Sequence, residues 1–86
     1  MAYQVEFDKR VGKDLKKLDP QVASRIIEKC SILSKEPVDD PNISRLKLRA
    51  NLYRLRVGDY RVIYLVEGNR VTIKYIKHRK DIYRSL

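Results

Sequence analysis

Residues 52–66 read LYRLRVGDYRVIYLV, and this stretch decides the fold. Apolar and polar side chains alternate over 52–57 and again over 60–66, which is the period of a β-strand. Gly58-Asp59 lies between the two runs and is a typical two-residue hairpin turn. Such a turn fixes the strand register. The predicted opposite pairs are Val57 and Tyr60, Arg56 and Arg61, Leu55 and Val62, and Arg54 and Ile63.

A second two-residue turn, Gly68-Asn69, leads into a third predicted strand over 70–77. One face of the three strands is then apolar or aromatic, and the helices are expected to cover it; the other face is cationic. Counting across the second turn predicts Tyr64 opposite Ile73, Ile63 opposite Lys74, and Arg61 opposite Ile76. The apolar face would hold Tyr53, Leu55, Val57, Tyr60, Val62, Tyr64, Val66, Val71, Ile73 and Tyr75. The cationic face would hold Arg54, Arg56, Arg61 and Lys74, beside Ile63, Leu65 and Ile76.

The sequence before the hairpin has the period of a strand and then of two helices. Its predicted elements are a strand over 3–7, a helix over 9–18, a helix from Pro20 to just before Pro37, a loop over 37–42, and an alternating stretch over 45–49. This order predicts one two-layer α+β domain over 1–86, with an N-terminal strand, a helical hairpin and an antiparallel β-meander. Residues 78–86 are expected to form a helical turn or a tail. Cys30 lies on the apolar stripe of the second helix and is predicted to be a core residue, not a nucleophile.

Composition narrows the class of protein. The chain has 86 residues and a single cysteine, so an internal disulfide is excluded. A structural zinc site is also excluded, because one cysteine and one histidine are too few ligands. No apolar run is long enough to span a bilayer, and the first residues do not resemble a signal peptide. These features predict a cytoplasmic protein.

The charge is concentrated in the second half of the chain. Residues 1–44 contain eight Lys/Arg and eight Asp/Glu, whereas residues 45–86 contain twelve and three, which gives the net charge of +9. The same half carries the strand patterns, so the charge is expected on a folded surface. Such a surface attracts polyanions. Alternatively, the charged surface binds an acidic protein, or it is an ordinary solvated surface without a partner.

The cationic face predicts a phosphate site. Arg56 opposite Arg61 is a like-charge pair, which costs up to about 1 kcal/mol across a ladder. A planar guanidinium is suited to phosphate and to the extra charge of a pentacovalent phosphate. However, the sequence has no pair of histidines, no obvious carboxylate pair, no glycine-rich phosphate loop and no set of metal ligands. The residues alone therefore predict anion binding and leave catalysis open.

The hairpin LYRLRVGDYRVIY (52–64), followed by the strand over 71–76 and HRKDIYR (78–84), resembles the RelE/ParE toxin family. The opening strand and the lysine-rich helical hairpin match as well, so the resemblance covers nearly the whole chain. For RelE-type members the resemblance implies a toxin that cleaves mRNA in the ribosomal A site without a metal ion or cofactor. The RNA 2′-hydroxyl attacks the adjacent phosphate and leaves a cyclic phosphate.

The resemblance also implies roles for individual residues. Arg61, Arg79, Tyr83 and Arg56 are expected to be catalytic, and Arg54, Lys74, His78, Lys47 and Lys80 to bind RNA or phosphate. Arg61 is the candidate clamp for the transition state. Tyr83 would accept the 2′-hydroxyl proton if surrounding cations lower its pKa from about 10. Arg79 would neutralise the leaving oxygen. His78 is either a further acid or base, or a surface histidine.

Two other functions stay open at this point. A ParE-like toxin would share the fold and inhibit DNA gyrase, and a non-catalytic module would bind RNA or the ribosome. Arg61, Arg79 and Tyr83 match the RNase pattern and favour the first function. The family implies a cognate antitoxin as partner, with an acidic or amphipathic segment that wraps the toxin.

Overall fold

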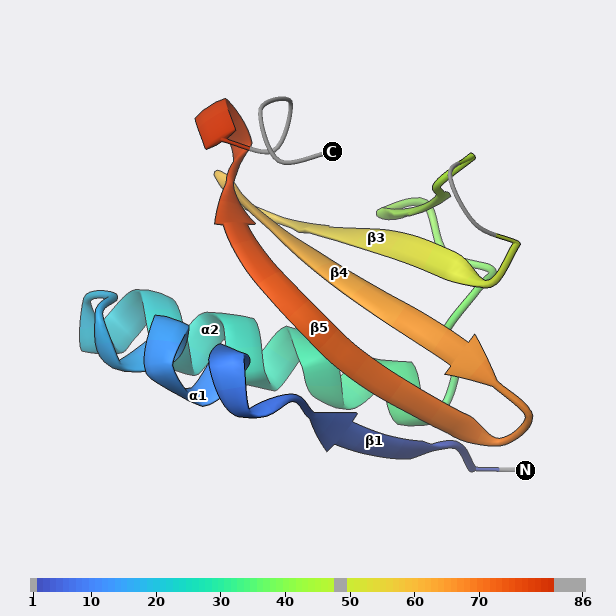
Figure 1. The fold of residues 1–86 in the computed structure, drawn as a ribbon. Coiled ribbons are helices and arrows are strands. Elements are labelled where there is room, and N and C mark those ends of the chain that lie inside the picture. The colour runs from blue at the N-terminus through green and yellow to red at the C-terminus, as the bar shows by residue number, and fades with distance from the viewer. Residues whose placement is uncertain (1, 48–49, 82–86) are drawn as a thin grey trace.

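The structure is a computed structural model that describes residues 2–47 and 50–81. The two-layer α+β architecture predicted from the sequence is confirmed: α1 and α2 pack on one face of a five-stranded sheet (Figure 1). Within the described ranges no helix has the length and apolar character needed to cross a membrane. The elements are β1 (Gln4–Phe7), α1 (Lys9–Lys16), α2 (Pro20–Ser31), the 3₁₀ turn η1 (Ile32–Ser34), β2 (Ile43–Arg45), β3 (Leu52–Val57), β4 (Tyr60–Glu67) and β5 (Arg70–His78).

The strand order is β1-β5-β4-β3-β2. The neighbours β2–β3, β3–β4 and β4–β5 are antiparallel, whereas β1 pairs parallel with β5. Gly58 and Gly68 open the two hairpin turns with φ of +58° and +60°, a left-handed conformation that glycine adopts without steric cost. Both turns predicted from the sequence are therefore confirmed.

Each of the two helices begins directly after a capping aspartate. The Asp8 carboxylate accepts a hydrogen bond from the Arg10 backbone N–H (3.0 Å), and the Asp19 carboxylate accepts one from the Gln21 N–H (2.9 Å). Each aspartate thereby satisfies a helix N-terminal N–H that has no partner within the helix. The helix α1 ends at Lys16, two residues before the predicted end.

The main core lies between the helices and the sheet. Val11 and Ile26 of the helices meet Tyr64 and Ile73 of the sheet, all with no exposed surface. Cys30 belongs to the same core, as predicted. The buried Tyr64 hydroxyl donates to the Pro37 carbonyl (2.7 Å) and thereby fastens the loop after η1 to the sheet.

The β4–β5 register differs from the prediction halfway along the ladder. Tyr64 lies opposite Ile73 as expected, but the next pair is Ile63 with Tyr75, so Lys74 is an extra residue in β5. A bulge of this kind reverses the faces of all following residues. The predicted pairs of Ile63 with Lys74 and of Arg61 with Ile76 are therefore wrong.

The bulge exchanges two predicted face assignments. Ile76 packs in the main core, whereas Tyr75 lies on the opposite face with Ile63. That face has a second, smaller apolar cluster at one end, made of Leu52, Ile63 and Leu65 with Leu46 and Tyr75 packed against it. We call the face opposite α1 and α2 the outer face.

The alternating stretch predicted over 45–49 lies only partly in the sheet. β2 ends at Arg45, and Leu46 turns inward onto the second cluster, where its backbone N–H donates to the Leu52 carbonyl (2.9 Å). Lys47 is in a turn, and residues 48–49 lie outside the described ranges.

Candidate nucleic-acid interface

Three basic residues form a transverse row on the outer face. Arg56 of β3 lies opposite Arg61 of β4, and Arg61 lies opposite Lys77 of β5. We call these three residues the cationic row. The first pair was predicted from the hairpin; Lys77 was missed, because only the bulge at Lys74 places it on this face. Like charges in adjacent ladder positions destabilise a sheet by up to about 1 kcal/mol per pair. Three adjacent cations therefore repel one another, and a bound anion would offset this repulsion.

Arg56 and Arg54 occupy the β3 side of the outer face. The exposed Arg56 side chain donates to the Asn42 side-chain carbonyl (3.3 Å), and its backbone N–H donates to the Asn42 backbone carbonyl (2.9 Å). Arg54 lies two residues earlier on the same strand, opposite Ile63, and is half-buried. The structure thus places both predicted β3 arginines on one face with Arg61.

The β3–β4 turn brings Arg61 and Arg79 together. One terminal nitrogen of Arg61, Nη1, donates to the carbonyls of Gly58 and Tyr60, both at 2.9 Å. Arg79 contacts the same turn, with its backbone N–H donating to the Asp59 carbonyl (2.7 Å) and its Nε 3.8 Å from the Asp59 carboxylate. Two arginines that are distant in the sequence are therefore held at one hairpin tip.

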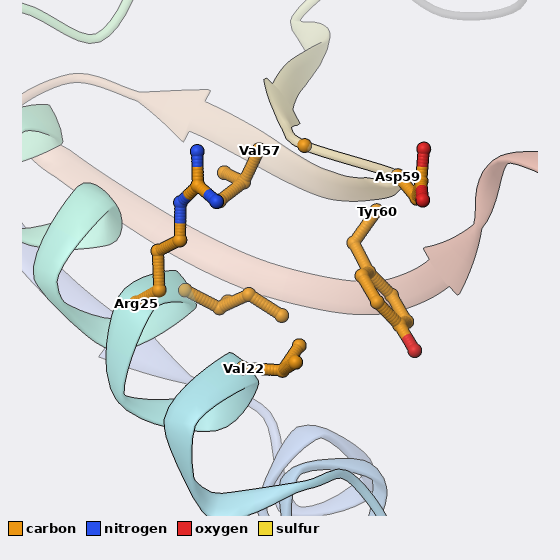
Figure 2. A pocket seen from close by; sticks show the side chains of 7 residues that line it. Val22, Arg25, Val57, Asp59 and Tyr60 are labelled. Carbon is orange, nitrogen blue, oxygen red and sulfur yellow. The ribbon is translucent and has the colours of Figure 1, made fainter.

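An open pocket lies beneath the same turn, on its helix side. Figure 2 shows Arg25 of α2 beside Val57 at one side of this pocket, with Asp59 and Tyr60 at the other. A terminal nitrogen of Arg25 comes within 3.8 Å of the position that a Cβ on Gly58 would occupy. Arginines from β4 and from the segment after β5 thus contact the turn, and Arg25 of α2 lines the pocket beneath it.

His78 is not part of the cationic row. It lies opposite Tyr60, one residue along from Arg61, and the two rings meet edge to face with centroids 5.3 Å apart. Since Tyr60 packs against the main core, His78 lies on the helix side of the sheet. Its Nδ1 accepts a hydrogen bond from the Lys80 backbone N–H (3.2 Å).

Lys74 is not part of the cationic row and pairs with the Asp8 carboxylate instead. Its ammonium group lies 3.7 Å from the Asp8 carboxylate, which is also 3.6 Å from Nε of Arg10. The backbone N–H of Arg10, and then the charges of Arg10 and Lys74, lower the pKa of Asp8. Lys74 therefore offsets the negative charge at the N-cap of α1. Tyr75 takes the place opposite Ile63 that was predicted for Lys74, and Lys77 takes the place opposite Arg61 that was predicted for Ile76.

The remaining predicted residues lie at the edges of the described chain. Lys47 and Lys80 are exposed, and Arg79 to Asp81 have helical backbone. Tyr83 lies outside the described residues. Within the described ranges, no three His, Cys, Asp or Glu side chains come together as metal ligands would.

The comparisons with known proteins agree with this architecture. A family model described as the ParE toxin of type II toxin–antitoxin systems matches residues 5–83. Toxin RelG of Mycobacterium tuberculosis is 33% identical over 87 residues, an alignment that covers 98% of this chain and 99% of RelG.

Two solved complexes contain a chain with the same fold. An archaeal RelE–RelB complex from Pyrococcus horikoshii gives a TM-score of 0.80 at 36% identity, and covers 92% of this chain and 97% of that chain. The RelBE2 toxin–antitoxin complex of M. tuberculosis gives a TM-score of 0.79 at 30% identity, and the match covers 92% of this chain and 100% of that chain. With a family model and full-length relatives that all match along nearly the whole sequence, this chain belongs to the RelE/ParE family of toxins from type II toxin–antitoxin systems.

Proposed function

We propose that this toxin is an endoribonuclease that cleaves mRNA on the ribosome, and that the cationic row binds the scissile phosphate. The observation that supports this proposal most strongly is the row itself. Arg56, Arg61 and Lys77 occupy adjacent ladder positions on the outer face, and Arg79 is held at the turn that also holds Arg61.

The proposed reaction is an internal transfer of the phosphoryl group. The RNA 2′-oxygen forms a bond to phosphorus as the bond to the 5′-oxygen of the next nucleotide breaks. The 2′-hydroxyl loses a proton to a base, and the leaving 5′-oxygen gains one. The products are a 2′,3′-cyclic phosphate and a free 5′-hydroxyl. Negative charge grows on the non-bridging oxygens during this step, and fixed cations stabilise it.

The residues divide this work by position. Arg61 is the proposed transition-state clamp, because the Gly58 and Tyr60 carbonyls fix its guanidinium at the hairpin tip. Arg56 and Lys77 flank it and would hold the substrate phosphates. Arg79 would neutralise the leaving oxygen, and Tyr83, outside the described residues, would accept the 2′-hydroxyl proton. Arginine stays charged at neutral pH and cannot serve as the base itself.

A cognate antitoxin is the proposed protein partner, and the cytoplasm the proposed site of action. The solved relatives from P. horikoshii and M. tuberculosis are toxins in complex with their antitoxins. A net charge of +9 makes an acidic segment a suitable partner for this chain as well.

The proposal is tested by translating a defined mRNA with and without the protein and mapping the new RNA 5′ ends. Cuts that appear only with ribosomes present support it. Intact mRNA together with gyrase-linked DNA breaks would instead indicate a ParE-like gyrase toxin. RNA that is bound but never cut would indicate a non-catalytic binding module.

A further inference from the structure

Arg10 and Tyr75 form a contact on the outer face that the proposed reaction does not use. Arg10 lies in the first turn of α1, and Tyr75 lies in β5, opposite Ile63. The Arg10 guanidinium carbon lies 4.8 Å from the centroid of the Tyr75 ring, and its Nη1 donates to the Tyr75 hydroxyl (3.4 Å). An arginine from the helical layer is thus laid over an aromatic ring of the outer face.

The position of the Arg10 guanidinium is fixed at several points. The Asp8 carboxylate lies 3.6 Å from its Nε, the Tyr75 hydroxyl accepts from its Nη1, and its central carbon lies over the Tyr75 ring. Even so, 61% of the Arg10 side chain is exposed. A guanidinium group is planar, so one that is held in position and still open to solvent offers a surface on which a nucleobase can stack.

This contact is close to the cationic row. Tyr75 lies two residues before Lys77 on the same strand and on the same face. Two residues of a strand span about 7 Å. An RNA strand whose phosphate lies at the row therefore places a neighbouring base within reach of Arg10.

The charge of Asp8 makes Arg10 better suited to bind the base of a nucleotide than its phosphate. Its carboxylate offsets the charge of Arg10 and of Lys74, so this corner of the face attracts phosphate less strongly than the row does. Stacking depends on the flat surface of the guanidinium and does not require its full charge. A base is therefore the better match than a phosphate.

We propose that Arg10, supported by Tyr75, is a base-stacking subsite for the nucleotide next to the phosphate held by the cationic row. The inference rests on the proposed function in one respect: its ligand is single-stranded RNA. It extends the site from the sheet to α1 and gives it a means of contacting the RNA beyond the phosphates.

The first test measures the affinity of a short single-stranded RNA over a range of salt concentrations. The RNA carries a 2′-deoxy nucleotide at each potential cleavage position, so binding is measured without cleavage. Arg10→Ala and Arg10→Lys are both expected to weaken binding by at least about fivefold, the lower end for loss of one stacked base. Because no phosphate contact is lost, the slope of log K against log salt stays the same in Arg10→Lys. Lys16→Ala, which removes an exposed cation from the same helix, is the matched control and should bind as the wild type does.

The second test replaces one nucleotide at a time with an abasic one. The wild-type protein should bind less tightly when the abasic nucleotide stands at one position, next to the phosphate-binding site. Arg10→Ala should bind this abasic RNA as tightly as it binds the intact RNA. Thermal unfolding of each variant checks that Arg10→Lys retains the fold.

The outcomes separate this inference from the proposed function. RNA that binds with the predicted abasic coupling but is never cleaved on ribosomes would refute the nuclease and leave the subsite standing. Cleavage without any abasic position coupled to Arg10 would refute the subsite alone. An Arg10→Lys variant that binds RNA as tightly as the wild type, or a wild type that does not bind RNA, would also overturn it.

Discussion

Lys77 lies directly opposite Arg61 in the β4–β5 ladder, because the bulge at Lys74 shifts the register by one residue. Without the bulge, Ile76 would occupy that position and Lys77 would point toward the helices. The bulge thus completes the row of three cations and at the same time turns Ile76 into the main core. One extra residue in β5 serves both the packing and the charge of the outer face.

The two lysines of β5 are expected to differ in RNA binding. Lys77→Ala should make the dependence of log K on log salt less steep by about 0.7, the value for one phosphate contact to a single strand. Lys74→Ala should change it less, since the Asp8 carboxylate already pairs with Lys74. Salt titrations of RNA binding by both variants measure this difference. A larger change for Lys74→Ala would show that the bulge does not select Lys77.

Tyr64→Phe should destabilise the fold. Burial raises the pKa of the Tyr64 phenol above its usual range, so the hydroxyl stays protonated and donates to the Pro37 carbonyl. The substitution leaves this carbonyl without its partner, which costs about 1–3 kcal/mol. Urea denaturation measures the loss. Tyr53→Phe, in the half-buried ring stacked on Tyr64, is the control and should cost less. Equal costs would contradict the role given to the hydroxyl.

Cys30 should be inert in the folded protein. Burial raises the pKa of its thiol to about 12, and its side chain has no exposed surface. The reactive thiolate is therefore nearly absent at neutral pH. Iodoacetamide should leave native protein unmodified at pH 7.5 and alkylate it in urea, with mass spectrometry as the readout. Rapid alkylation without denaturant would place Cys30 outside the core.

Asp8 should make the fold sensitive to acid. Its pKa is lowered in the folded protein, chiefly by the Arg10 backbone N–H and then by the charges of Arg10 and Lys74. The stabilisation by its charge is present above the ordinary carboxyl pKa of about 3.9 and is lost as the pH falls through the lower folded value. Asp8→Asn keeps an N-cap acceptor but cannot titrate.

Denaturation midpoints of wild type and Asp8→Asn between pH 7 and pH 2.5 test this expectation. The wild type should be the more stable at neutral pH, and the gap should close at the acid end. A gap of constant size would show that the charge of Asp8 contributes nothing.

The sequence was sufficient for the parts of the fold that depend on local patterns. Alternation and the Gly58-Asp59 turn predicted the β3–β4 hairpin together with its register, including Arg56 opposite Arg61. The apolar stripes predicted the two helices, and the second begins at Pro20 as predicted, since proline is favoured at the first helical position.

The rest depends on contacts between distant segments. No turn or propensity in β5 marks Lys74 as a bulge; the position depends on packing Ile76 into the core and on the Asp8 carboxylate. The exchange of Tyr75 and Ile76, the place of Lys77 and the contact with Arg10 all follow from this one residue. The sequence held one signal of the bulge, the run Ile73-Lys-Tyr-Ile76. Strict alternation through this run places Ile76 on the cationic face, away from the core.

The central claim is that Arg61 in the cationic row acts in RNA cleavage, and the most direct test is single-turnover cleavage of ribosome-bound mRNA. Arg61→Ala is predicted to slow cleavage by about 100- to 1,000-fold, the usual cost of removing one transition-state donor. Arg70→Ala is the matched control, because Arg70 lies at the far end of β5 beside Glu6, and it should cleave at the wild-type rate. An Arg61→Ala variant that cleaves as fast as the wild type would contradict the account.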